Sequence, residues 1–169
     1  MVKRIIGALQ LDPAVYRELK ADPTATLPSL LLVVLCVLAA GVAALPAGGL
    51  WAFANLAGSA FVSWTIFVLA AYVIGAKALP GPDTQVTLGE LVRTLGFALT
   101  PTLLLVFGIV PALQIVVVPL SFVWVFFATL MALRVTLGVG TLRAVLVAVV
   151  SYLITGVISG LLLPPVASG

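Results

Sequence analysis

The sequence predicts an all-α integral membrane protein with five transmembrane helices, an N-terminus in the cytoplasm and a C-terminus outside. Of its 169 residues, 63% are apolar and 8% are charged, whereas about a quarter of the residues in a soluble domain are charged. The charged residues fall into three patches: 3–22, 77–93, and Arg134 with Arg143. Five spans place every patch, and with them all eight lysines and arginines, on one side of the membrane, which the positive-inside rule makes the cytoplasm.

The chain forms a single membrane domain, residues 1–169, because five spans of about 20 residues use roughly 100 residues and leave only short connections. The predicted spans cover about 27–45, 50–74, 95–110, 112–133 and 142–163. Turn residues separate them: Pro46 to Gly49, Gly108 to Pro111, and Gly138 with Gly140.

Residues 1–26 form a cytoplasmic or interfacial segment. Asp12-Pro13 and Asp22-Pro23 each predict the start of a helix. The aspartate can cap the helix with its side chain, and the proline suits the first helical position because an N–H there would have no partner within the helix. The first of these helices, about 13–20, is short and charged, so we expect it to lie at the cytoplasmic interface. The second continues into the first span.

The third span is short, so it either extends into the residues before it or pairs with the fourth span as a shallow hairpin. Thr87 and Glu90 have the spacing of a capping box, which predicts a helix that starts at Thr87. One face of this helix is apolar, and the other carries Glu90, Arg93 and Thr94. The pattern predicts an amphipathic lead-in to the third span that lies on the membrane surface.

Two rows of small or polar residues lie inside the predicted spans. The fifth span carries a small-residue row, Ala144, Ala148, Gly156 and Gly160, which is expected to be a helix-packing or oligomer seam. The second span carries a polar row, Asn55, Ser59 and Ser63. We expect Asn55 to face another helix, because an unpaired amide is unfavourable in hydrocarbon.

Several classes of function are disfavoured by what the chain lacks. No Asp, Glu, Lys, Arg or His lies in the interior of a predicted span, since Arg143 is at the edge of the fifth, and this argues against a proton-driven transporter. With no histidine and a single cysteine, Cys36, the usual zinc ligands and nucleophilic pairs are missing, so we predict no catalytic residue, metal or cofactor. The basic residues lie at span ends, which favours anionic headgroups of the bilayer over nucleic acid as partners.

Short motifs along most of the chain resemble the Yip1 domain family. They are the stretch from Gly96 and Phe97 to Pro101 at the start of the third span, Trp124 followed by Arg134 and Gly138, and the two Asp-Pro pairs of bacterial members. The resemblance implies a five-span bacterial-type protein, which we expect in the inner (plasma) membrane. Eukaryotic relatives are associated with Rab-type GTPases and membrane traffic, and they carry a long cytoplasmic N-terminal region before the spans. This sequence has no counterpart of that region, so we do not extend GTPase binding to it.

The leading hypothesis is a non-enzymatic membrane protein that organises protein partners or lipids at the cytoplasmic membrane face, in a membrane-organisation or trafficking-like role. One alternative is a passive channel or small-solute facilitator, lined by the polar row of the second span and the hydroxyls of the fifth. Another is an accessory subunit of a larger membrane complex. Self-association through the small-residue row is compatible with each of them.

Overall fold

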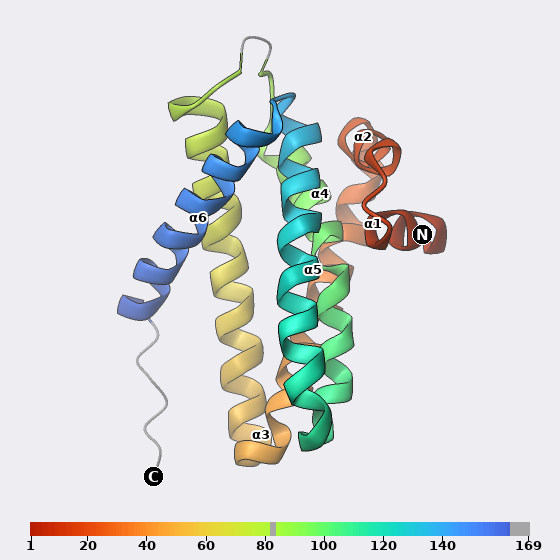
Figure 1. The fold of residues 1–169 in the computed structure, drawn as a ribbon, viewed down its shortest axis with the longest axis vertical. Helices are drawn as coiled ribbons and strands as arrows, with labels where there is room; N and C mark the ends of the chain where they lie inside the picture. Colours follow the sequence, from red (N-terminus) through yellow and green to blue (C-terminus); the bar gives the residue numbers. More distant parts are fainter. Residues whose placement is uncertain (82–83, 163–169) are drawn as a thin grey trace.

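The computed structural model describes residues 1–81 and 84–162, which are helical apart from short connections and contain no strand. Figure 1 shows the order of the elements. They are α1 (Val2–Leu9), α2 (Pro13–Ala21), the short η1 (Pro23–Ala25), α3 (Thr26–Val73), the π-helical η2 (Ile74–Ala78), α4 (Leu88–Ala98), the 3-10 helix η3 (Thr100–Ile109), α5 (Pro111–Leu137) and α6 (Thr141–Leu162). Asp83 and Leu163, which the predicted second patch and fifth span include, lie outside the described residues.

Helix α3 reverses direction at a glycine pair, as the turn residues predicted. Gly48 and Gly49 have non-helical backbone angles, and Gly49 has a φ of 59°, a conformation that glycine adopts without a steric penalty. The first limb (26–47) and the second limb (50–73) therefore run side by side in opposite directions (Figure 1).

Within the described residues, three helical runs are long and apolar enough to cross a membrane: Pro23–Ala78, Pro111–Leu137 and Thr141–Leu162. A fourth is formed if α4 and η3, which are bent by 40°, count as one span. The predicted class, an all-helical membrane protein, is confirmed.

The predicted N-terminal caps are confirmed. Asp12 accepts a hydrogen bond from the Ala14 N–H at 2.8 Å, and α2 begins at Pro13. Asp22 accepts one from the Thr24 N–H at 2.9 Å and starts η1, which leads directly into α3. Helix α1 lies in the part of the chain for which the sequence had indicated only an interfacial segment.

Helix α4 begins at the predicted capping box, but its predicted polar face does not point outward, because two of the three residues of that face are buried in the bundle. The Thr87 hydroxyl accepts from the Glu90 N–H at 3.3 Å, and the Glu90 carboxylate accepts from the Thr87 N–H at 2.9 Å. Arg93 and Thr94, expected on the polar outer face, are both buried. Thr94 accepts a hydrogen bond from Thr136 of α5 at 2.9 Å, so neighbouring helices supply the polar partners that water would have supplied.

The segment formed by α4 and η3 extends along α5 to the end of the bundle that holds the α3 turn (Figure 1). Gln114 joins these parts: its amide donates to the Ala43 carbonyl at 2.9 Å and to the Gly108 carbonyl at 2.7 Å. We call this end the far end. Of the two alternatives for the short third span, this arrangement favours the one in which α4 lengthens the span. It does not favour a shallow hairpin of the third and fourth spans.

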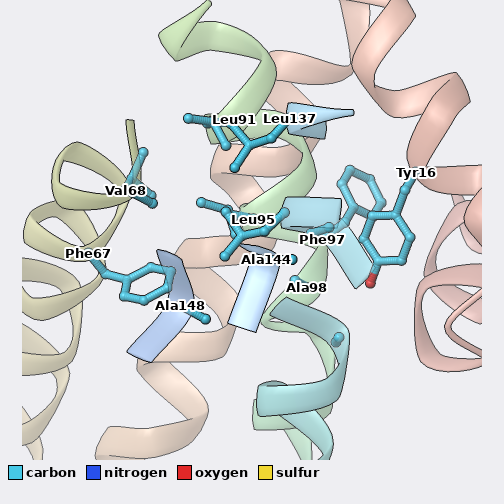
Figure 2. Packing of buried hydrophobic residues seen from close by; sticks show 14 of the residues in the cluster. Tyr16, Phe67, Val68, Leu91, Leu95, Phe97, Ala98, Leu137, Ala144 and Ala148 are labelled. Carbon is cyan, nitrogen blue, oxygen red and sulfur yellow. The ribbon is translucent and has the colours of Figure 1, made fainter. Parts of the chain in front are cut away.

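The hydrophobic core lies where α4 meets α3, α5, α6 and α2. Figure 2 shows Leu91, Leu95 and Phe97 of α4 among Leu137 of α5, Ala144 and Ala148 of α6, and Phe67 and Val68 of α3. Tyr16 brings α2 into the same buried cluster. Helix α4 is therefore the centre of the bundle, and it positions the elements around it.

Candidate functional site: the charged end of the bundle

The charged side chains of the helical bundle gather at the end opposite the α3 turn. Figure 1 shows η2, the start of α4, the end of α5 and the start of α6 together at this end. These elements carry Lys77, Glu90, Arg93, Arg134 and Arg143. We call it the charged end. The sequence predicted this gathering from charge alone, but not the contacts made there.

Helices α1 and α2 form a compact unit, residues 2–21, which we call the N-terminal platform. Gly7 allows the two helices to approach closely, because a Cβ at this position would overlap the side chain of Val15. The fully buried Tyr16 donates a hydrogen bond to the Ala8 carbonyl at 3.4 Å. Burial also raises the pKa of Tyr16. The two helices therefore behave as one packed unit.

Trp124 of α5 holds the platform against the bundle. Its indole Nε1 donates to the Leu9 carbonyl at the end of α1, at 2.9 Å. That carbonyl is one of the acceptors that a helix end leaves without an intrahelical partner. The sequence motif singled out Trp124, but a contact across 115 positions could not be read from it.

Arg93 of α4 makes the second attachment. Its guanidinium donates to the Leu19 carbonyl at 2.9 Å and the Lys20 carbonyl at 2.7 Å, the last turn of α2, and to the Thr26 hydroxyl at 3.4 Å. Only 7% of Arg93 is exposed, and no carboxylate among the described residues pairs with it. A cation at a helix C-terminus is favourable because the free carbonyls carry partial negative charge. Arg93 therefore joins α2, α4 and the start of α3.

Arg4 fixes the polar side of the platform through two ion pairs. Its guanidinium lies 2.7 Å from Glu18 and 2.6 Å from Asp22. The Thr24 hydroxyl and then the Arg4 guanidinium lower the pKa of Asp22, because both hydrogen-bond to its ionised form. Lys3 of α1 and Arg17 of α2 remain exposed, as do the apolar side chains of Val2 and Ile6 on α1. The outer surface of the platform is thus both cationic and apolar.

The small-residue row of α6 is divided between two surroundings. Ala144 and Ala148 are fully buried in the core, whereas Gly156 and Gly160 are exposed and have nothing within 4 Å of an added Cβ. The reason is geometric: a four-residue spacing exceeds the 3.6-residue turn, so the row moves around the helix by about 40° per step. The chain uses half of the predicted seam for its own packing.

The polar row of α3 is divided in a similar way. The Ser63 and Ser159 hydroxyls lie 3.0 Å apart and join α3 to α6, while Ser59 donates to the Leu56 carbonyl of its own helix. Asn55 is exposed and makes no hydrogen bond with a described residue, so the prediction that it faces another helix stays a prediction, and that helix would belong to a second chain. Helix α6 diverges from α3 toward the far end (Figure 1).

The remaining motif residues have structural positions. Gly96 lies where α4 meets the first limb of α3, Phe97 is fully buried, and Pro101 lies in the first turn of η3 after the bend. Arg134 is exposed in the last turn of α5, where a cation is favourable, and Gly138 ends that helix with a φ of 65°.

The helices and their apolar surfaces define the class of the molecule, an all-helical membrane protein. The family follows from the sequence: the Yip1 domain model matches residues 6–163, nearly the whole chain, and the chain belongs to the Yip1 domain family. No curated protein and no solved structure matches it. The family is not known for enzymatic activity.

Proposed function

We propose that the chain is a non-enzymatic membrane protein that organises protein partners or lipids at the cytoplasmic membrane face. The observation that carries this proposal is the attachment of the N-terminal platform to the bundle by Trp124 in the middle of α5 and Arg93 of α4. The attachment presents a defined surface, with Lys3 and Arg17 outward. A trafficking-like or membrane-organising role is plausible for the family.

The proposal includes five crossings of the inner membrane of a bacterial cell: the two limbs of α3, α4 with η3, α5, and α6. The N-terminus and the charged end are cytoplasmic and the C-terminus is outside, because all eight lysines and arginines precede or follow spans on one side. The first limb of α3 is about 33 Å long at 1.5 Å per residue, close to the thickness of the hydrocarbon core.

Cysteine labelling tests this topology, and the chain suits the method because Cys36 is its only cysteine and is buried. In a Cys36→Ala background, we expect Ala47→Cys at the far end to react with a membrane-impermeant maleimide in intact cells. Gln85→Cys at the charged end is expected to react only after permeabilisation. Both positions are exposed, so access to the reagent is the only variable. The reverse pattern would contradict the proposed orientation.

Photo-crosslinking in living cells tests the working surface. A photoreactive amino acid at Arg17, exposed on α2, is expected to give reproducible adducts with a protein partner or with lipid headgroups. The matched position is Leu153, which is 65% exposed on α6 and is expected to react with acyl chains only. The absence of reproducible adducts at Arg17, together with unchanged membrane morphology in a deletion strain, would refute the proposal.

A further inference from the structure

A pocket opens at the charged end between the top of α3, η2 and the start of α4. Its volume is about 440 Å³, within the range of roughly 300–1,000 Å³ of small-ligand sites. Its polar lining consists of Tyr72, Lys77, Thr84, Gln85, Thr87 and Glu90. Lys77 lies on the π-helical η2, and such turns occur frequently at functional sites.

The pocket holds two opposite charges, and neither forms an ion pair with a residue that the structure describes. Lys77 and Glu90 both line it, and the ion pairs of the described residues do not include either of them. One oxygen of Glu90 accepts from the Thr87 N–H in the capping box, and its other oxygen has no donor among the described residues. A cation and an anion held apart in one pocket match a ligand that carries both charges.

An apolar strip leads from this pocket along the outer face of α3. Leu69 and Val73, one turn apart, are 47% and 56% exposed, and they share the helix face of Tyr72 and Ala76, which line the pocket. Under the proposed topology the pocket is at headgroup depth, and the strip runs into the hydrocarbon. A ligand with a dipolar head and an acyl chain fits this arrangement.

We propose that the pocket binds the headgroup of a phospholipid with a primary ammonium group, such as phosphatidylethanolamine. The phosphate lies at Lys77, and the ammonium donates hydrogen bonds to the free oxygen of Glu90. The trimethylammonium group of phosphatidylcholine fits this pocket less well, because it has no N–H to donate to Glu90. Such groups are usually held by several aromatic rings, and Tyr72 is the one aromatic residue among the described lining residues. An anionic headgroup places no cation at Glu90. The inference rests on the proposed cytoplasmic position of the charged end.

The test uses the full chain, purified in detergent and freed of lipid, with native mass spectrometry of bound lipid. Phosphatidylethanolamine, phosphatidylcholine and phosphatidylglycerol with identical acyl chains are titrated in parallel. We expect phosphatidylethanolamine to bind about ten-fold more tightly than the other two, and Lys77→Gln to weaken it about ten-fold, because each loss removes one charge-assisted contact. Arg134→Gln, which removes an exposed charge in the last turn of α5, outside the pocket lining, is expected to leave binding unchanged.

Glu90→Gln separates recognition from folding, because glutamine also serves in a capping box and keeps the start of α4. It is expected to keep thermal stability while abolishing the preference for phosphatidylethanolamine over phosphatidylcholine. Equal binding of the three lipids to the unmodified chain, or equal losses in Lys77→Gln and Arg134→Gln, would overturn the assignment. If the lipid test failed but Arg17 still gave specific adducts, only the assignment of the pocket would be lost and the proposed function would stand. Reversed cysteine labelling would overturn both the proposed function and the assignment of the pocket.

Discussion

Gly96→Ala is expected to destabilise the fold by about 2–3 kcal/mol, the range for an overpacked core. Gly96 lies where α4 crosses the first limb of α3. An added Cβ would overlap the Ser29 hydroxyl and lie 3.2 Å from Val33 Cγ2 and 3.3 Å from the Ser29 carbonyl oxygen. The hydroxyl cannot rotate away freely, because it donates to the Val92 carbonyl at 3.0 Å and to the Arg93 carbonyl at 3.2 Å. The helices must therefore separate or lose these bonds.

The same substitution at Gly89 is the matched control. Gly89 is on the same helix, and an added Cβ there would lie 3.4 Å from Arg93 Nη1 and 4.0 Å from Thr87 Oγ1, which is ordinary van der Waals contact. Because alanine favours helix by up to about 1 kcal/mol over glycine, Gly89→Ala is expected to be neutral or stabilising. The free energy of unfolding from titration with SDS in mixed micelles measures both. Equal effects at the two positions would show that helix propensity, rather than close packing at Gly96, decides the result.

Arg93→Met is expected to release the N-terminal platform and to lower stability by about 2–3 kcal/mol, the scale of hydrogen bonds to a charged group. Methionine fills much of the same space but donates no hydrogen bond, so the carbonyls of Leu19 and Lys20 lose their partner. Hydrogen exchange in residues 2–21 is expected to rise at least about ten-fold, because undocking exposes the amides of α1 and α2 together.

Two further variants test the geometry at Arg93. Arg93→Lys keeps the charge, but a single ammonium replaces the planar fork that reaches both carbonyls, so an intermediate effect is expected. Arg134→Met removes an exposed arginine at the same end of the bundle and is expected to leave the platform protected. If Arg93→Met left exchange in 2–21 unchanged, Trp124 and apolar packing alone would hold the platform.

Errors in the sequence analysis had one physical origin. The apolar and polar faces of α4 were assigned as if its polar face met water, yet Arg93 and Thr94 find partners on α2, α3 and α5. Asn55 was expected to face another helix, and within this chain it is exposed and makes no hydrogen bond with a described residue. In both cases the sequence shows that the side chain is polar and needs a partner. Which helix lies next to it is decided by the tertiary structure.

The sequence by itself determined the membrane class, the helix starts at Asp12, Asp22 and Thr87, and the turns at Gly48–Gly49 and Gly138. Each of these depends on a residue and its near neighbours in the chain, or on composition. The tertiary structure alone decided that α4 is central, that Arg93 and Trp124 hold the platform, and that Ser63 meets Ser159. These contacts join residues 74, 115 and 96 positions apart, and they depend on which helix faces lie together. No local pattern encodes that choice, because it is made by the packing of the whole bundle.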